Sequence, residues 1–436
     1  MGSPTFHPLP SRVDFPALER EVLDRWEDRK VFERCLEQTA GGPLWVFYEG
    51  PPTANGVPGA HHIEPRVFKD LFPRFKTMQG YHVPRKAGWD CHGLAVELAV
   101  EQELGLSGKP EIEKYGIAEF NAQCRESVLR HVDMWEQLTR RMAYWTDLSD
   151  PYRTMDAAYV QSVWWSLKQI YDKGLLFRDF RITPYCTRCG TGLSDHELGQ
   201  PDVYQPVADP SVTVRFPLLS GPVADRYGSN EVDLLIWTTT PWTLVSNALV
   251  AVDPELTYAV ARPRDGSARP VLIAEALVEK VLGDGWEVQD RFTGAELERS
   301  AYRRPFDLID VPDGHFVALG DFVSVDEGTG LVHCSPTFGA DDFALCRAYD
   351  VPMVNPIDLQ GRFLPEIPMV GGTYFKRADP TLVDSLVERG LMFRHETAEH
   401  SYPHCWRCHT ALIYYALPAW YVRTTAAKDA LLRENA

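Results

Sequence analysis

The sequence contains no long apolar run: none of its hydrophobic stretches approaches the roughly 20 residues that a membrane-spanning helix needs. Positions 1–22 hold prolines and acids where a secretory signal would hold a basic segment and an apolar core. Basic residues are also in deficit, because 44 Lys and Arg stand against 61 Asp and Glu, a formal net charge of −17. That charge argues against a protein coated in nucleic acid, while a local basic groove stays compatible with it. We expect a cytoplasmic protein without membrane contact.

Composition and cysteine usage narrow the class of protein. The chain has 436 residues, of which 44% are hydrophobic and 24% charged, so disordered and fibrous classes are excluded. This length predicts about two to four domains. The nine cysteines are an odd number, and four of them form two Cys-x-x-Cys pairs, which indicates metal binding in a reducing compartment.

The N-terminal third has the pattern of a nucleotide-binding α/β unit. Hydrophobic spacing predicts a helix at 13–38, a buried strand at 44–48 and a glycine-rich loop at 49–56. A second helix at 61–78, a second strand at 81–90 and a mainly helical region at 118–175 follow. Strand, glycine-rich loop, helix and strand form the βαβ unit of a nucleotide-binding sheet.

The pattern changes after about Pro184 to a mixed or mainly β domain. Six short β-type runs separated by turn residues lie at 212–216, 234–240, 258–260, 270–273, 316–318 and 330–333. A helical pattern returns at 380–389, and a helix-like stretch at 426–436 has neither a cap nor a following strand. We therefore expect that the sequence stops within a longer protein.

The loop after the first predicted strand is a candidate phosphate site. Gly50, Gly56 and Gly59 let the backbone approach a ligand, and a helix N-terminus behind such a turn presents N–H groups and a positive dipole end. His61 and His62 begin that helix and could donate hydrogen bonds to phosphate oxygens. An ordinary turn with two surface histidines explains the same residues equally well.

Asp90 ends the second predicted strand, where ligands bind in open α/β sheets. A carboxylate there can hold an ammonium group or a ribose hydroxyl. The adjacent Cys91 and His92 could suggest a cysteine nucleophile, but neighbours along an extended chain point to opposite faces, so we disfavour it.

The two Cys-x-x-Cys pairs, Cys186 with Cys189 and Cys405 with Cys408, each have the form of a zinc knuckle. Together they predict a tetrahedral Cys₄ site that ties together the ends of an inserted domain. Such a site is structural, because four protein ligands leave no open position. His196, His404 and His409 are possible substitute ligands, and the alternative is four unpaired buried thiols.

A run of threonines, Thr238, Thr239 and Thr240, ends one predicted strand, and His333, Asp341 and Asp342 follow another. Hydroxyls with a nearby His and Asp can position water and an ammonium group for ester hydrolysis. Taken alone, the residues favour a simpler interpretation, in which threonines serve as strand formers and the paired acids cap a helix.

Taken together, these motifs resemble the N-terminal part of the isoleucyl-tRNA synthetases, a family of class I aminoacyl-tRNA synthetases. The similarity runs from Asp14 to Arg423 and is most specific in the segments at 48–56, 86–90, 238–243 and 404–408. Leucyl and valyl relatives share the architecture but differ in the first loop.

The resemblance implies a Rossmann-type catalytic domain split by an inserted, mainly β editing domain. It implies the first catalytic half at 1–183, a zinc-binding module at 184–202 and 399–412, the editing domain at 203–398 and the start of the second catalytic half at 413–436. It further implies ATP, Mg²⁺ and structural zinc as cofactors, isoleucine and tRNA(Ile) as partners, and a monomer.

By the same resemblance, Gly50 and Pro51 lie against the isoleucine side chain and Asp90 holds its α-ammonium group. ATP is bound by the family's His-x-Gly-His signature region, here Asn55, Gly56, Gly59, His61 and His62. The signature is altered, because Gly59 stands at the first histidine position and His61 at the glycine position.

Editing removes valine, which a pocket for isoleucine rejects by only ~1–3 kcal/mol, a magnitude established on this enzyme family itself. The resemblance places Thr238, Thr239, Thr240 and Asn247 in the editing pocket, Asp342 on the α-ammonium group of the misacylated residue, and His333 on the terminal ribose. Three mild departures from the family pattern lie nearby, at Ala95, Val245 and Ser335.

The family's Lys-Met-Ser-Lys-Ser loop and anticodon-binding domain are missing. We therefore expect an N-terminal fragment of an isoleucine–tRNA ligase that can hydrolyse Val-tRNA(Ile) but activates isoleucine poorly. The alternatives are a valyl or leucyl relative and a non-catalytic tRNA-binding or zinc-stabilised remnant. A freestanding thiol or metal hydrolase is disfavoured, because the metal set leaves no open position.

Overall fold

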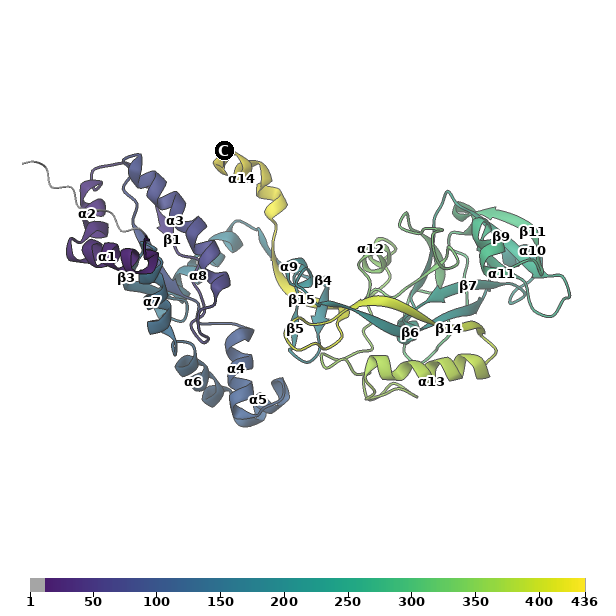
Figure 1. Ribbon diagram of the computed structural model, residues 1–436. Coiled ribbons are helices and arrows are strands. Elements are labelled where there is room, and N and C mark those ends of the chain that lie inside the picture. Colours follow the sequence, from purple (N-terminus) through teal and green to yellow (C-terminus); the bar gives the residue numbers. More distant parts are fainter. Residues whose placement is uncertain (1–11, 436) are drawn as a thin grey trace, which may run out of the picture. The chain divides into compact units, whose positions relative to one another are not determined.

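The computed structural model describes residues 12–435, which fall into two units. The first unit ends at Leu176 and resumes at Thr424, and the second is Phe177–Arg423. Across the described part of the chain, no helix combines the length and apolar character needed to cross a bilayer. Figure 1 labels the elements of both units.

The first unit contains the predicted βαβ arrangement. Its three-stranded parallel sheet has the order β1 (Phe47–Tyr48), β2 (Arg85–Trp89) and β3 (Asp147–Arg153). Helix α3 (Ile63–Met78) connects β1 to β2 after a short 3₁₀ turn, η1 (Ala60–His62). The parallel pairing of Phe47 with Arg85 requires this crossover, because parallel strands cannot be joined by a tight turn.

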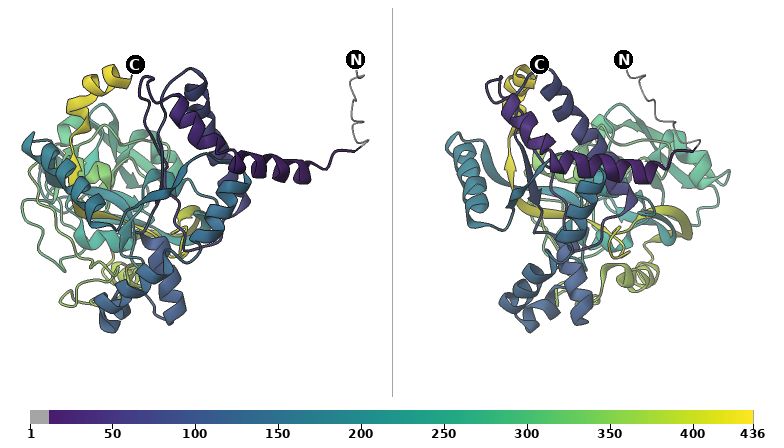
Figure 2. Two further views of the ribbon diagram at one scale, coloured as in Figure 1. Left: turned by 90° about the vertical axis from the view of Figure 1, so that its left-hand side faces the viewer. Right: turned by 60° about the vertical axis from the view of Figure 1, so that its left-hand side comes forward.

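The helices of the first unit differ from the prediction in two places. The helix predicted at 13–38 is two helices, and Figure 2 shows the change of direction between them, at Lys30 in the left-handed region (φ 48°). The mainly helical region at 118–175 also contains β3, whose sequence lacks an apolar alternation. The remaining elements are α1 (Phe15–Asp28), α2 (Val31–Gln38), α4 (Leu94–Leu104), α5 (Lys109–Tyr115), α6 (Ile117–Ser127), α7 (Val132–Arg141), α8 (Ala157–Asp172), η5 (Thr424–Ala427) and α14 (Lys428–Asn435).

The strand predicted as buried at 44–48 is short and largely exposed. Leu44 is 63%, Val46 52% and Tyr48 62% exposed, and only two residues form β1. The strand lies at the edge of its sheet and, among the described residues, pairs only with β2. The prediction of a buried strand was therefore wrong for the described chain.

The second unit is built on three sheets. A six-stranded sheet has the order β11-β9-β10-β7-β6-β14, and two three-stranded sheets have the orders β12-β8-β13 and β15-β4-β5. The strands are β4 (Leu176–Cys186), β5 (Thr191–Gly192), β6 (Tyr204–Pro217), β7 (Asp233–Thr238), β8 (Leu249–Val252), β9 (Thr257–Pro263), β10 (Val271–Ala274), β11 (Trp286–Thr293), β12 (Phe316–Leu319), β13 (Val332–Cys334), β14 (Met392–Pro403) and β15 (Ile413–Val422).

All six predicted β-type runs overlap strands, and the helix predicted at 380–389 overlaps α13. The other strands of this unit were not predicted, and β14 is the most informative of them, because its charged sequence gives no apolar alternation. The helical elements of this unit are α9 (Asp195–Leu198), α10 (Pro222–Tyr227), η2 (Pro241–Ser246), η3 (Glu275–Leu277), α11 (Val278–Leu282), η4 (Gly294–Leu297), α12 (Ala340–Ala348) and α13 (Phe375–Glu388).

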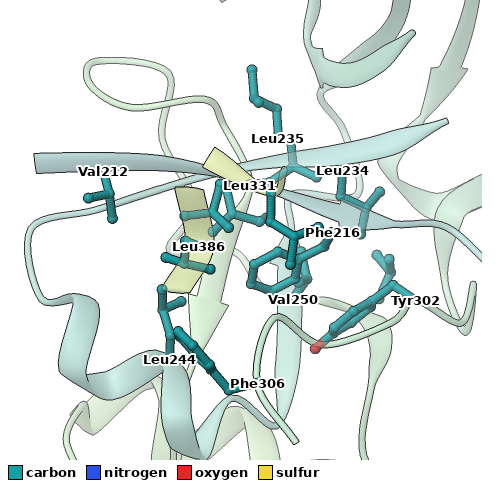
Figure 3. Packing of buried hydrophobic residues seen from close by; sticks show 14 of the residues in the cluster. Val212, Phe216, Leu234, Leu235, Leu244, Val250, Tyr302, Phe306, Leu331 and Leu386 are labelled. Atoms are coloured by element: carbon teal, nitrogen blue, oxygen red, sulfur yellow. The ribbon is translucent and has the colours of Figure 1, made fainter. Parts of the chain in front are cut away.

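The main core of the second unit lies between the six-stranded sheet and the segments packed on it. Phe216 from β6 is fully buried, and its ring centroid lies 5.5 Å from that of Tyr302 (Figure 3). Leu244 of η2 and Leu386 of α13 belong to the same buried cluster. The core therefore fixes η2, the segment that follows the predicted threonine run.

Replacing Phe216 by alanine tests this core. The fully buried ring leaves a cavity when it is removed, so we expect Phe216→Ala to lower the free energy of unfolding by about 3–5 kcal/mol. Urea unfolding followed by circular dichroism measures the change. Val387→Ala, at a position of the same unit that is 55% exposed, should shift it by less than ~0.5 kcal/mol. Equal effects of the two substitutions would contradict the assigned core.

Candidate functional site

A cavity of about 390 Å³ in the second unit collects most of the residues predicted for ester hydrolysis. Five segments contribute to it: the end of β7, the helix η2, the loop at 322–331, the strand β13, and the turn that leads into α12 together with the first turn of that helix. Its wall carries hydroxyls, an imidazole and two carboxyl groups; the groups used below come from Thr238, Thr239, Thr240, Thr243, Ser335, His333 and Asp342, and the second carboxyl group is that of Glu327. The simpler interpretation of these residues as unrelated strand formers and caps does not explain their convergence on one cavity.

The threonine hydroxyls form a connected row along the cavity. The Thr240 hydroxyl oxygen lies 3.1 Å from that of Thr238 and 3.2 Å from that of Thr243. The row is held by the turn of the backbone, because the N–H of Thr240 donates to the Thr238 hydroxyl at 3.1 Å and Thr243 donates to the Thr240 carbonyl at 2.7 Å.

Asp379 of α13 holds the threonine segment from the other side. Its carboxylate accepts a hydrogen bond from the N–H of Trp242 at 2.9 Å, at the start of η2 where backbone N–H groups have no partner within the helix. Burial raises the pKa of Asp379 to about 7. The Trp242 ring also packs edge-on against Phe375 of α13, with centroids 4.8 Å apart.

Asp342 presents the buried carboxyl group of the cavity, whereas Glu327, which also lines it, is exposed. It lies in the first turn of α12, and its carboxylate accepts a hydrogen bond from the N–H of Ser335 at 2.8 Å. Burial raises the pKa of Asp342 to about 7, although the Ser335 N–H acts in the opposite direction. Gly339 makes room for this group, because a Cβ there would lie 2.6 Å from the Asp342 Cγ. A cationic ligand in the cavity would restore the charged form of the carboxyl group.

His333 lies deeper in the wall. Its Nε2 is 2.7 Å from the Thr243 hydroxyl and its Nδ1 is 3.3 Å from the Asn247 amide nitrogen. Burial lowers the pKa of His333 to about 4, so the ring is neutral at pH 7. Asn247, which was predicted to line the pocket, is fully buried behind His333 and does not reach the cavity.

The four predicted cysteines converge at the other end of the second unit. Their sulfur atoms all lie within 4.8 Å of one another, and Cys408 lies 3.4 Å from Cys186 and 3.5 Å from Cys189. Buried Leu193 and Leu412 pack around them. Among the described residues, His196, His404 and His409 do not belong to this cluster, so the alternative of a substitute histidine ligand finds no support.

In the first unit, the predicted amino-acid loop is held by an ion pair between a buried carboxylate and a partly exposed lysine. Glu49 is 4% exposed, and its carboxylate lies 2.7 Å from the Lys69 Nζ of α3. The same ammonium group donates to the Gly50 carbonyl at 3.1 Å, and Tyr152 donates to the Glu49 carbonyl at 2.5 Å. These contacts fix the backbone that leads into Pro51.

Asp90 follows β2 and lies against this loop, because its N–H donates to the Pro52 carbonyl at 3.0 Å. The structure thus brings Asp90 next to the segment containing Gly50 and Pro51. Cys91 is buried, and the His92 ring nitrogen Nδ1 lies 3.0 Å from the Thr154 hydroxyl. The ring is engaged by a hydroxyl, which leaves the cysteine-nucleophile alternative without support.

The predicted ATP loop turns several polar groups inward. The Asn55 amide donates to the Ala95 carbonyl at 3.0 Å, and the Gly56 carbonyl accepts from the Trp135 indole at 2.9 Å. These two contacts set the course of the loop as far as Val57, which is exposed.

The two histidines of this loop lie together. The Gly59 N–H donates to the His62 Nδ1 at 2.9 Å, and the His61 ring lies back over Gly59, where a Cβ would be 2.8 Å from its Cε1. The centroids of the two rings are 3.8 Å apart. Burial, followed by the charges of His61 and Arg66, lowers the pKa of His62.

Several residues of the cavity and its support were not predicted as site residues, among them Thr243, Ser335 and Asp379. Thr243 stands in the threonine-rich segment, three positions after Thr240, and that 3₁₀ spacing was the available signal. Ser335 had been noted only as a departure from a family pattern. Asp379 could not be found from the sequence, because it contacts Trp242 across a separation of 137 residues.

The comparisons with known proteins cover the whole chain. Residues 21–436 match the family described as tRNA synthetases class I (I, L, M and V). An isoleucine–tRNA ligase of Streptomyces coelicolor is 62% identical over 437 residues, covering 100% of this chain and 41% of that protein. That of Thermus thermophilus is 48% identical over 422 residues, covering 97% of this chain and 39% of that protein.

This chain therefore spans about two fifths of the curated relatives that it matches. A solved structure titled "The crystal structure of GlLeuRS-CP1" gives a weak likeness, with a TM-score of 0.34 and 17% identity over 43% of this chain and 98% of that one. The family match extends over nearly every described residue of both units. The chain belongs to the class I tRNA synthetases of the I, L, M and V group.

Proposed function

We propose that this chain contributes to an isoleucine–tRNA ligase and carries its hydrolytic editing site. The observation that carries the proposal is the cavity in which a row of threonine hydroxyls faces the carboxyl group of Asp342. The identity to curated isoleucine–tRNA ligases favours isoleucine over valine or leucine as the cognate amino acid. The partners of the whole enzyme are then isoleucine, ATP and tRNA(Ile).

The editing chemistry assigned to the cavity is hydrolysis of Val-tRNA(Ile). Asp342 binds the α-ammonium group of the valine, and the hydroxyls of Thr238, Thr239 and Thr240 orient the ester and the attacking water. Water adds to the ester carbonyl, the bond to the ribose oxygen breaks, and the water proton passes to that oxygen. Catalysis of this kind is positioning and charge stabilisation, with no covalent intermediate on the protein.

The synthetic site is assigned to the loop of the first unit. Gly50 and Pro51 border the isoleucine side chain, and Asp90 beside Pro52 holds its ammonium group. His62 would present Nε2–H to a phosphate oxygen of ATP, since its Nδ1 already accepts from Gly59. His61, whose ring covers Gly59, is the second imidazole of the altered signature.

The remaining ATP groups are assigned around these histidines. Asn55, Gly56 and Gly59 shape the phosphate loop, and Mg²⁺ would arrive with the triphosphate. The domain division follows the family, with 1–183 and 413–436 in a Rossmann-type catalytic domain and 203–398 in the editing domain. Segments 184–202 and 399–412 form the zinc-binding module.

The four cysteines suit a structural zinc ion. Tetrahedral zinc with Zn–S bonds of about 2.3 Å separates its sulfur ligands by roughly 3.8 Å. The sulfur separations of 3.4 and 3.5 Å are close to that geometry, and the backbone N–H of Cys189 already points at the Cys186 sulfur. Cys186, Cys189, Cys405 and Cys408 would hold the ion and stabilise the module, leaving no coordination position for catalysis.

Hydrolysis of Val-tRNA(Ile) and Ile-tRNA(Ile) by this chain tests the editing assignment. We expect preferential loss of the valine ester, reduced at least tenfold by Asp342→Asn, because the ammonium site loses its charge. Asp341→Asn removes the same charge at the neighbouring exposed position and should leave the preference intact. Hydrolysis of neither ester by the folded protein, or equal loss in both variants, would contradict the assignment.

The raised pKa of Asp342 predicts a pH dependence of ligand binding. Below pH 7 the carboxyl group is increasingly protonated, so an ammonium ligand should bind more weakly there. Calorimetric titration with valinol, whose amine stays protonated to above pH 8, should give a Kd about tenfold higher at pH 6 than at pH 8. The Asp342→Asn variant should bind weakly at both values. A flat profile for the unsubstituted protein would refute this role of Asp342.

Zinc analysis tests the cysteine cluster. Purified protein should contain about one zinc ion per chain, measured by atomic emission, and Cys405→Ser should lose it and lower the unfolding temperature. Cys346→Ser changes a buried thiol outside the cluster and should keep the metal. Zinc retained by Cys405→Ser at full stoichiometry would show that the cluster is not the binding site.

A further inference from the structure

A chain of hydrogen bonds leads from the core of the second unit to the threonine row. Its first member is Tyr302, which is 2% exposed and packs its ring among apolar core side chains (Figure 3). The Tyr302 hydroxyl donates to the Asn247 Oδ1 at 2.7 Å. Asn247 directly follows η2, so this contact ties the core to the segment that carries the threonines.

The orientation of the Asn247 amide follows from its partners. The Leu249 backbone carbonyl, which can only accept, lies 3.1 Å from the amide nitrogen, so the nitrogen must face it and the oxygen must face Tyr302. The amide nitrogen has a second hydrogen, and the His333 Nδ1 lies 3.3 Å from that nitrogen. Nδ1 is therefore the acceptor in this contact.

The proton of the neutral ring must then be on Nε2. Nε2 lies 2.7 Å from the Thr243 hydroxyl oxygen, which accepts from it, while the Thr243 hydrogen goes to the Thr240 carbonyl at 2.7 Å. Both ring nitrogens of His333 are thus used within the protein. A neutral imidazole bonded in this way has no lone pair left for a water molecule.

We propose that Tyr302 and Asn247 fix His333 in its Nε2–H tautomer, and that His333 is a positioning residue that acts through Thr243. In this assignment His333 neither removes a proton from the attacking water nor contacts the ester. It locks the Thr243 hydroxyl, which in turn lies 3.2 Å from that of Thr240 in the cavity wall. The link to hydrolysis rests on the proposed editing function, but the tautomer does not.

Nitrogen NMR of histidine-labelled protein measures the tautomer directly and needs no substrate. At pH 7 the His333 signals, assigned by their loss in His333→Gln, should show an unprotonated Nδ1 and a protonated Nε2. Asn247→Asp replaces the donor by an acceptor and should move a proton to Nδ1. A protonated Nδ1 in the unsubstituted protein would overturn the proposal whether or not the chain hydrolyses any ester.

Hydrolysis of Val-tRNA(Ile) by paired variants separates positioning from direct action. Glutamine at position 333 can donate to Thr243 but cannot act as a base, so His333→Gln should retain activity within about tenfold, while His333→Ala should lose more. Thr243→Val should lose activity and Thr243→Ser should regain it. The double variant Thr243→Val/His333→Ala should be no slower than the slower single one, since both act through one contact. Multiplicative losses would assign His333 a direct role.

Tyr302→Phe tests the residue that begins the chain of hydrogen bonds. Removing its hydroxyl leaves a buried amide oxygen without that donor, and we expect hydrolysis to fall about 5–30-fold, the range that one buried hydrogen bond spans. Tyr185→Phe removes the hydroxyl of another buried tyrosine, which donates to the Leu359 carbonyl at 3.1 Å away from the cavity lining, and should change hydrolysis far less. Equal losses of hydrolysis in both variants would show that Tyr302 acts only through the stability of the fold and would contradict its positioning role.

Discussion

The pairing of β6 with β14 is the constraint on which the second unit depends. The two strands align antiparallel from the pair Tyr204–Pro403 to the pair Val214–Met392, and Figure 1 shows them side by side. This contact closes a loop of well over a hundred residues and therefore costs considerable chain entropy. One end of the ladder leads into the cysteine cluster, and β6 continues into the sheet whose strand β7 ends at the threonine row. The pairing of β6 with β14 therefore determines the positions of both the cysteine cluster and the threonine row.

The cavity combines polar groups that are expensive to remove from water with partners that satisfy them. Burial keeps His333 neutral and raises the pKa of Asp342 and Asp379, yet each has a hydrogen-bond partner at 2.7–2.9 Å. Of these three groups, Asp342 is the carboxyl group that lines the cavity and can meet a charged ligand there, since Asp379 lies outside the lining and is bonded to the backbone of η2. A site organised in this way is rigid before the substrate arrives, which suits catalysis by positioning.

The sequence predicts what its local patterns encode. Apolar runs such as 234–240 gave strands, and the two Cys-x-x-Cys pairs gave a four-cysteine cluster, which the structure brings together. β14 could not be predicted, because its charged residues form a strand only through pairing with β6. The exposure of Leu44 and Tyr48 likewise depends on which elements cover the sheet edge. The roles of Asp379 and Tyr302 arise from contacts between segments far apart in the sequence.

The most direct test of the account is a crystal structure of this chain with adenosine carrying valine through a non-hydrolysable amide at its ribose. The account predicts the valine ammonium group within hydrogen-bonding distance of the Asp342 carboxylate and its isopropyl group beside Thr238–Thr240. His333 should remain on Thr243, out of contact with the ligand. A ligand bound elsewhere, or an ammonium group without an Asp342 contact in an otherwise occupied cavity, would contradict the assignment of this cavity as the hydrolytic site.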